Sequence, residues 1–423
     1  MNQTYFHKNY YPWVITLMSA LFLFYKHLMQ VSPSIMTHDL MATFHLHGVG
    51  LGNLAATFFY SYMITQLFVG VLLDKLSPRY LSSGALFCAA AGTYFFSTAQ
   101  TLTFASLSRS LVGVGAAFAT VSYMKLAANW FPKHRFALVG GLLATAAMLG
   151  AIFGQAPLAY LVQVIGWRHS MAVVSFIGFT ISVLFLLIVR DRSAATNRSN
   201  ETNASVTLKA IKAVITKPYN WLLTLYSGLA FSPVAVIGGL WGTPFVNEAY
   251  RLPNTTSATL ISFVFAGLAI GGPTLGYLSD RIKNRHSVML YSSIASLLSI
   301  TILLYIHPLP LSLLAALLFI FGFSTGAFML AFAIGKETNP LFLSATIVAL
   351  INTGDALFGA VTEPLIGELL DLFGDGKIIN GAPYFSVTNY QHAFFVIPIY
   401  LAIATGCVFL MKQWRTADQD AQL

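Results

Sequence analysis

Residues 70–79 read GVLLDKLSPR, and residues 276–285 read GYLSDRIKNR. Both stretches end an apolar segment and follow the same order: glycine, three residues, aspartate and then basic residues. The two stretches are 206 positions apart in a chain of 423 residues. Duplication of a unit of that size leaves a repeat at this spacing. The pattern therefore predicts a chain built from two similar halves.

The composition places the chain in a membrane. Hydrophobic residues make up 57% of it and charged residues only 9%, which does not suit a water-soluble globule. Apolar stretches of about 20 residues recur, near the length that crosses a bilayer core of about 30 Å. We predict an all-α integral membrane protein with twelve transmembrane helices. The predicted spans are 12–36, 48–73, 80–99, 102–125, 136–160, 169–190, 220–246, 256–278, 287–306, 309–334, 341–367 and 391–411.

A polar segment separates two apolar blocks of six spans each. Residues 190–217 are rich in serine, asparagine, threonine and basic residues, which is typical of a linker. We predict an N-terminal six-helix bundle at 1–189, a cytoplasmic linker at 190–219 and a C-terminal six-helix bundle at 220–423. The first span lacks a small-residue cleavage pattern, so we expect a retained helix and not a signal peptide.

The net charge of +9 follows membrane topology and does not indicate a nucleic-acid partner. With the N-terminus in the cytoplasm, three basic residues fall outside, namely Arg168, Arg251 and Lys377, and two lie within spans, Lys26 and Arg109. All the others fall in cytoplasmic segments, as the positive-inside rule requires. We therefore expect both termini in the cytoplasm.

Several motifs point to one family. In GVLLDKLSPR, the residues Gly70, Asp74 and Arg79 stand where a known signature loop has them, whereas Ser77 and Pro78 replace a usual glycine and basic residue. The other motifs are LSRSLVGVGAA at 107–117, NWFPKHR at 129–135 and GWR at 166–168. Over nearly its whole length the chain resembles transporters of the major facilitator superfamily.

The resemblance implies two six-helix bundles around a central cavity, with one solute site exposed alternately to each side of the membrane. It also implies a monomer without a cofactor. No phosphate-binding loop of the Walker type, no catalytic residue set and no zinc signature is readable, so an enzyme is not predicted. Residues 24–74 resemble a bacterial branch related to the lysosomal dipeptide transporter, with relatives in intracellular bacteria that take up nutrients. A bacterial inner membrane is the expected location.

The signature loop is interpreted as a conformational latch. The resemblance implies that Asp74 rests against the start of helix 11, where Asn339 would be the N-cap and Pro340 the first helical residue. The alternative is a solvated loop charge that only sets topology. The predicted latch residues of the two halves are Gly70, Asp74, Arg79, Gly276, Asp280 and Arg281.

Two predicted spans carry glycines one turn apart, Gly150 with Gly154 and Gly267 with Gly271. Small residues let helix backbones approach closely in lipid. These glycines are predicted to form either sliding contacts between the bundles or static packing. The stretch GAIFGQAPLA departs from the glycine–proline motif of many exchangers, which weakens an antiporter or drug-efflux interpretation.

Lys26 lies deep in the first predicted span, where an unpaired ammonium group costs about 2.5 kcal/mol or more. Gln30 and Pro33 fall on the same helix face, which is predicted to line the cavity. Arg109 is expected at a similar depth in helix 4. Both cations are candidates for solute binding or proton coupling, and the alternative for Arg109 is to hold the bundle together.

Helix 11 offers the opposite charges. Asn352, Asp355, Gly359 and Glu363 share one broad face of that predicted helix. A carboxyl group there can take a proton or an amine, depending on the charges beside it. We therefore predict that Lys26, assisted by Arg109, attracts a solute carboxylate, while Asp355 or Glu363 receives an amine or a proton. A gating role is an alternative for Glu363.

The segment HDLMATFHLH at 38–47 contains histidines and an aspartate that could suggest a metal site or a pH sensor, but an ordinary interfacial loop is the preferred interpretation. No metal site is predicted.

The predicted function is a proton-coupled secondary transporter that imports a small polar solute, such as an amino acid, a short peptide or an organic anion. The alternatives are a siderophore or organic-anion carrier with a larger site lined by Tyr60, Tyr62 and Trp241, a drug exporter, and a membrane receptor that moves no solute.

Overall fold

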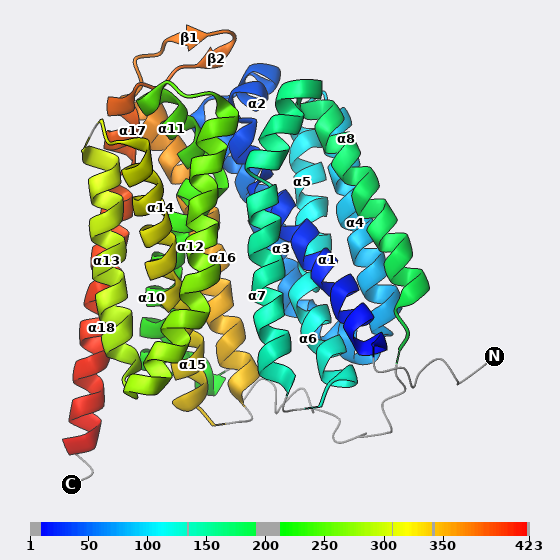
Figure 1. Ribbon diagram of the computed structural model, residues 1–423, viewed down its shortest axis with the longest axis vertical. Helices are drawn as coiled ribbons and strands as arrows, with labels where there is room; N and C mark the ends of the chain where they lie inside the picture. Colours follow the sequence, from blue (N-terminus) through cyan, green and yellow to red (C-terminus); the bar gives the residue numbers. More distant parts are fainter. Residues whose placement is uncertain (1–9, 133–134, 192–211, 307, 341–342, 421–423) are drawn as a thin grey trace. The chain divides into compact units, whose positions relative to one another are not determined.

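The computed structural model is almost entirely α-helical (Figure 1). It describes residues 10–132, 135–191, 212–306, 308–340 and 343–420. These residues divide into two compact units. Unit 1 lies within Met1–Phe44 and Leu54–Asn197, and unit 2 lies within His45–Asn53 and Arg198–Leu423. Most of the predicted linker falls outside the described residues, and its boundaries remain predictions.

Unit 1 is built on two groups of packed helices. The helix α4 packs on both α5 and α8, and α1 packs on α6 and α7. Large aromatic side chains such as Phe22, Tyr25, Phe96 and Phe185 are fully buried in this unit. Its helices are α1 Tyr11–Val31, the 3₁₀ turn η2 Ser32–Ile35, α2 Thr37–Phe44, most of α3 Gly48–Lys75, α4 Pro78–Thr98, α5 Leu102–Ala116, α6 Phe118–Trp130, α7 Phe136–Phe153 and α8 Ala156–Ile188. The first residues of α3, up to Asn53, belong to unit 2.

Unit 2 is built around α10, which packs on α16 and α18, and around α14, which packs on α12 and α13. A short antiparallel hairpin pairs Ile378 with Pro383. The elements of this unit are α10 Pro218–Val236, the π-helix η4 Ile237–Trp241, α11 Gly242–Tyr250, α12 Asn254–Ile282, α13 Arg285–Tyr305, α14 Leu311–Thr325, the 3₁₀ turn η5 Gly326–Met329, α15 Leu330–Glu337, α16 Ser344–Phe373, β1 Ile378–Ile379, β2 Ala382–Pro383, α17 Val387–Ala393 and α18 Val396–Asp420.

Side-chain caps begin several of these helices. The Ser77 hydroxyl accepts from the backbone N–H of Tyr80 at the start of α4, and Pro78 occupies the first turn. A capping box joins Ser386 and Asn389 at the start of α17. These caps satisfy backbone donors that the first turn of a helix leaves without partners.

The predicted span 136–160 is not continuous. α7 ends at Phe153, and Gln155 has a non-helical backbone with φ −100° and ψ −104°. The new helix α8 begins at Ala156, because Pro157 suits a first turn and not a helix interior. Gly166 then divides α8 with φ 77°, a conformation that glycine adopts without strain. This kink separates the predicted fifth and sixth spans.

Each of the twelve predicted spans overlaps a helix of the structure. Among the described residues, nine helices are long and apolar enough to cross a membrane. The stretch Leu138–Ile188 counts once in that number, although it contains both α7 and α8. The structure therefore supports an all-helical membrane protein, and the count of twelve crossings remains a prediction.

The expected start of helix 11 is wrong. α16 begins at Ser344, and its N-cap residue Leu343 provides no side-chain cap. The Asn339 amide is used elsewhere: its Nδ2 donates to Asn220 Oδ1 over 2.9 Å and to the carbonyl of Gly335 over 2.8 Å. Because these bonds hold Asn339 against α10 and α15, Asn339 does not cap α16.

Candidate functional site

Lys26 is buried in unit 1, and its ammonium group lies against Tyr62 of α3. Only 8% of its surface is exposed. Nζ donates a hydrogen bond to Tyr62 Oη over 3.3 Å and lies 4.7 Å from the centroid of the same ring. A phenol ring stabilises a cation without neutralising it. These two contacts bring no opposite charge to Lys26, and an anionic ligand can supply one.

Arg109 of α5 lies beside the same aromatic pair. Its Nη1 donates to the carbonyl of Met29 over 2.8 Å, and its Cζ is 5.5 Å from the centroid of the Phe58 ring. Phe58 and Tyr62 are one turn apart on α3, and their rings stack at 6.1 Å. One face of α3 thus carries an aromatic pair that receives both buried cations.

Unit 1 has few acidic residues to balance these cations. Before residue 191 the chain contains only Asp39, in the short helix α2, and Asp74, next to the end of α3. The helices α1, α4, α5, α6, α7 and α8 contain no aspartate or glutamate. The long helices of unit 1 therefore hold positive charge without a carboxylate in their interior.

Two irregular backbone segments meet one turn beyond Gln30, which is itself half-buried. The turn η2 contains Ser34, whose hydroxyl accepts from Gln155 Nε2 over 2.8 Å. Gln155 is fully buried at the break between α7 and α8. Irregular backbone within a membrane protein is tolerated where side chains satisfy it, and broken helices often border solute sites.

Asp355 is buried in unit 2, on α16. It is 6% exposed, and its Oδ1 has no hydrogen-bond partner among the described residues. The Ser227 hydroxyl of α10 faces this carboxyl group. Asn352 lies one turn earlier and is half-buried. A buried carboxyl group with an unused oxygen has room for a further donor.

Glu363 lies two turns further along α16 and is 2% exposed. Its backbone carbonyl accepts from Trp241 Nε1 over 3.1 Å. Trp241 belongs to the π-helix η4 and is fully buried. Gly359, which the sequence places on the same face, is also buried. The acidic residues of the predicted helix-11 face therefore line the interior of unit 2.

The first signature loop binds the end of α8. The Ser77 hydroxyl donates to Asp191, and the backbone N–H of Arg79 donates to Asp191 Oδ1 over 3.1 Å. Arg79 Nε donates to the carbonyl of Leu186 over 2.7 Å. The side chain of Asp74 lies outside the described residues. At Gly70 a Cβ would meet no atom of the described residues within 4 Å, so no close helix approach is seen there.

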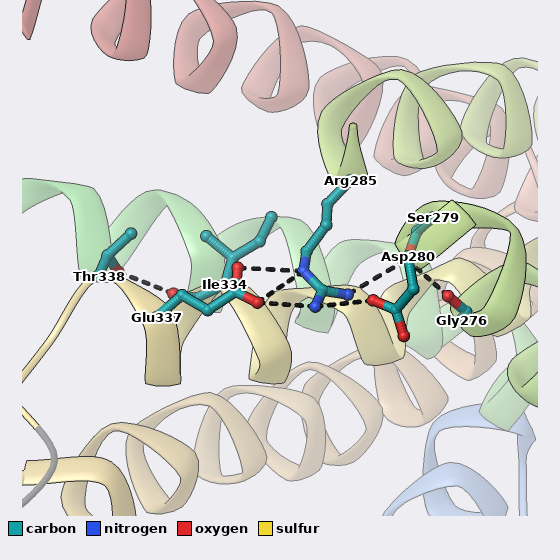
Figure 2. Close-up of polar contacts among 7 residues, drawn as sticks. All are labelled: Gly276, Ser279, Asp280, Arg285, Ile334, Glu337 and Thr338. Carbon is teal, nitrogen blue, oxygen red and sulfur yellow. Dashed lines mark hydrogen bonds and ion pairs between the residues drawn. The ribbon is translucent and has the colours of Figure 1, made fainter. Parts of the chain in front are cut away.

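The repeat of that loop forms an ion-pair network at one end of unit 2 (Figure 2). Arg285 pairs with Asp280 over 2.9 Å and with Glu337 over 2.7 Å, and it donates to the Ser279 hydroxyl over 3.2 Å. The network joins α12, α13 and α15. Arg281 is exposed, and Gly276 has no neighbour within 4 Å of a Cβ among the described residues.

The predicted packing glycines lie at helix crossings inside each unit. A Cβ at Gly150 or Gly154 would approach α1 backbone atoms closer than 3.0 Å, and a Cβ at Gly267 or Gly271 would do the same to α14. Each pair therefore lets two helices of one unit approach closely. These contacts favour static packing over a sliding surface.

Asp371, near the end of α16, caps the start of α3. Its Oδ1 accepts from the N–H of Gly48 over 2.7 Å and its Oδ2 from the N–H of Val49 over 2.8 Å. Residues His45–Asn53 belong to unit 2, so this contact is internal to that unit. A carboxylate suits the positive end of a helix.

The segment 38–47 forms α2 and the turn after it. Burial raises the pKa of the Asp39 carboxyl, and the charge of His38 partly opposes this. Among the described residues no group of three or more histidine, cysteine or acidic side chains could hold a metal ion.

Several residues of these sites were not predicted from the sequence. Phe58 carried no polar signal, although its spacing from Tyr62 places both on one helix face. Arg285 and Glu337 are charges near predicted span ends and look like ordinary loop charges. Asp371 could have been suspected, because an acidic residue near a helix C-terminus opposes the dipole of its own helix.

The chain belongs to the Major Facilitator Superfamily, whose model matches residues 13–338. The fold and the family are those of membrane transporters and not of enzymes. The protein is therefore an integral membrane transporter of this superfamily, as the motifs of the sequence indicate.

Particular relatives are distant. The chain is 24% identical to the membrane sensor protein UhpC of Salmonella typhimurium, covering 88% of this chain and 84% of that protein. It is 24% identical to the hexuronate transporter of Bacillus subtilis, covering 57% of this chain and 58% of that protein. Among solved structures it resembles the inward-facing, unoccupied bacterial homologue of the human lysosomal transporter Spinster, with a TM-score of 0.77 and 16% identity, covering 96% and 98% of the two chains. The predicted branch within the superfamily remains a prediction.

Proposed function

We propose that the protein is a proton-coupled secondary transporter that imports a small polar organic solute with an acidic group. The observation that carries this proposal is Lys26, a buried cation whose described partner is the neutral phenol of Tyr62. A cation at that depth costs about 2.5 kcal/mol or more on insertion scales, and an accompanying anion or water lowers that cost. A solute carboxylate or phosphate supplies that anion.

The composition of the long helices of unit 1 also supports a solute with an anionic group. They contain no acidic side chain apart from Asp74 near the end of α3. Arg109 of α5 contacts α1 at the carbonyl of Met29, three residues beyond Lys26, and adds a second positive charge. The hexuronate transporter among the relatives is named for an organic acid. Among amino acids, short peptides and organic anions, the acidic group is the shared feature that Lys26 and Arg109 would recognise.

Proton coupling is assigned to Asp355. A buried carboxyl group changes its charge when its surroundings change, which is what coupling requires. The unused Oδ1 of Asp355 and the adjacent Ser227 hydroxyl support this role. In this proposal Gln30 and Asn352 contribute neutral hydrogen bonds to the solute, because each lies one turn from a charged residue on its own helix.

The remaining features of the proposal concern movement and location. The two predicted six-helix bundles expose the solute site alternately to each side of the membrane. The protein works as a monomer in a bacterial inner membrane, with both termini in the cytoplasm. The signature loops act as latches that open when access changes. The network of Arg285, Asp280 and Glu337 supports such a role for the second loop, because a few exposed ion pairs break at little cost.

Counterflow and proton-driven uptake in proteoliposomes test these roles separately. Labelled glucuronate, glutamate and a dipeptide serve as probes. We expect Lys26→Met to weaken binding of the solute about ten- to hundredfold, since a charge-assisted contact contributes about 1.5–3 kcal/mol. We expect Asp355→Asn to abolish accumulation driven by a pH gradient but to keep counterflow. Normal accumulation by Asp355→Asn would refute the coupling role.

The relative UhpC is named as a sensor, so a receptor that moves no solute is the second candidate function. The same proteoliposomes separate the two. A receptor would bind a probe, which thermal stabilisation detects, and would show no counterflow at any concentration of that probe.

A further inference from the structure

The helical segment of residues 218–250 contains a π-helix in its interior. α10 ends at Val236, the π-helix η4 covers Ile237–Trp241, and α11 continues from Gly242. Among the described residues, this is the most deeply buried of the candidate membrane spans, because 83% of its most apolar stretch is buried. A π-helix widens the backbone and is found frequently at functional sites. Its position inside a buried helix therefore calls for a reason.

The two glycines of η4 differ in their surroundings. A Cβ at Gly238 would lie 2.6 Å from Cζ of Phe265, so this glycine is needed for close packing. Among the described residues, and apart from its chain neighbours and its own helix backbone, a Cβ at Gly239 would have a single atom within 4 Å, Oε1 of Glu363 at 3.6 Å. Gly239 is nevertheless buried. Unfilled space therefore lies over Gly239, inside unit 2 and beside a carboxylate oxygen.

Glu363 lies in a part of α16 that is tied to the segment of residues 218–250 at two points. Its backbone carbonyl accepts from Trp241 Nε1, which ties α16 to the end of η4. On the preceding residue, the Thr362 hydroxyl accepts from the Ser232 hydroxyl of α10 over 2.8 Å. α16 and the π-helix are thus held together on either side of Gly239. The backbone on both sides of this space is therefore held in place.

The chemistry of this space selects a small donor. A carboxylate oxygen only accepts hydrogen bonds, and it binds a charged donor about twice as strongly as a neutral one. The opening at Gly239 accepts a group about as large as the missing methyl. A primary ammonium group has one heavy atom, a positive charge and three donors. A guanidinium group is planar and needs a broader opening.

We propose that Gly239 and Glu363 form a subsite for the primary ammonium group of the transported solute, with Gly239 as its specificity-determining residue. The inference rests on the proposed function, because it assigns a second recognised group to the same solute. It narrows the solute class to acids that also carry an amino group.

Matched probe pairs test the subsite. Glutamate is compared with 2-hydroxyglutarate, and glucosamine 6-phosphate with glucose 6-phosphate, because each pair differs only by an amino group in place of a hydroxyl. Ethanolamine, which has no acid group, tests the amine subsite alone. Binding is measured by thermal stabilisation of the full-length protein in detergent and by counterflow. The variants are Gly239→Ala and Glu363→Gln. The control is Gly406→Ala, because a Cβ there meets no atom within 4 Å in the part of the chain that the structure describes.

Gly239→Ala leaves the fold intact, because its methyl group would make only an ordinary contact at 3.6 Å. We expect the unmodified protein to prefer the amino member of at least one pair. Gly239→Ala and Glu363→Gln should weaken binding of that amino member and of ethanolamine about tenfold or more and leave the hydroxy member unchanged. Gly406→Ala should keep the preference.

Three results overturn the inference. The first is equal binding of both members of every pair by the unmodified protein. The second is a preference for the amino member that survives in Gly239→Ala. The third is thermal stabilisation of the unmodified protein by sodium chloride, but not by choline chloride, together with loss of that stabilisation in Gly239→Ala. This result would assign the space to a metal cation. Failure of the proposed function alone would give a different result. No acidic probe would then bind or exchange, but ethanolamine would still bind, and Gly239→Ala would still weaken its binding.

Discussion

Replacing Asp371 with asparagine should loosen the start of α3 by a predictable amount. The carboxylate accepts from Gly48 and Val49 over 2.7 and 2.8 Å, and it faces the positive end of the helix. Asparagine keeps one acceptor oxygen, so the variant loses one charge-assisted hydrogen bond and the interaction with the helix dipole. Alanine loses both bonds.

The size of the effect follows from the partial exposure of Asp371. A hydrogen bond to a charged group contributes about 1.5–3 kcal/mol, and a helix cap typically about 1 kcal/mol. Because this site is only partly buried, the lower values apply, about 1–2 kcal/mol for asparagine. For a unit of this size we expect the melting temperature to fall by about 2–4 °C per kcal/mol.

The assay is the melting temperature of the purified protein in detergent. Asp375→Asn is the matched control, because the Asp375 side chain is largely exposed and its Oδ2 lies 3.8 Å from Lys377 Nζ, too far for a hydrogen bond. Gly367→Ala should match the effect of Asp371→Ala, since its methyl group would collide with the backbone of Gly48 and move the cap out of reach. A melting temperature of Asp371→Ala equal to that of Asp375→Asn would refute the reasoning.

Three further predictions concern unit 2. Glu337→Gln should lower the melting temperature by no more than about 4 °C, and less at high salt, because exposed ion pairs contribute about 0–1 kcal/mol; a larger, salt-independent fall would contradict this. Gly271→Ala should cost about 1–3 kcal/mol, because its methyl group would overlap a backbone oxygen of α14; melting like that of Gly406→Ala would show that the crossing is loose. The hydrogen bond to Glu248, together with burial, raises the pKa of Tyr384 above its usual 10.0. The stability that the protonated Tyr384 contributes is therefore present below pH 10 and is lost as the pH rises through the raised pKa. Tyr384→Phe should remove that loss in melting curves, and an unchanged pH profile would exclude the effect.

Much of the fold can be predicted because apolar length and charge asymmetry are local properties of the sequence. The break between α7 and α8 escaped prediction, although Gly154 and Pro157 flank it. Pro157 favours a break, but membrane helices also tolerate glycine and proline where neighbouring groups compensate. At this break Gln155 bonds to Ser34, 121 positions away. Long-range hydrogen bonds of this kind leave no local pattern.

The candidate site could be predicted only in part, for the same reason. Lys26 attracts notice because a charge in an apolar run must be compensated. Its partner Tyr62 was only one of several aromatic candidates, because the pairing depends on how α1 packs against α3. Asn339 shows the opposite error: a good local cap signal was overridden by the amide pair that it makes with Asn220. Gly239 carries no signal at all without the position of Glu363.

The most direct test of the central claim is solute counterflow by Lys26→Met in proteoliposomes. The account predicts that the unmodified protein exchanges an acidic solute and that Lys26→Met raises the half-saturating concentration about tenfold or more, whereas Lys75→Met, at the exposed end of α3, does not. Melting temperatures of the variants show that both are folded. Exchange of the acidic solute by Lys26→Met with an unchanged half-saturating concentration would contradict the claim that Lys26 binds the acidic group.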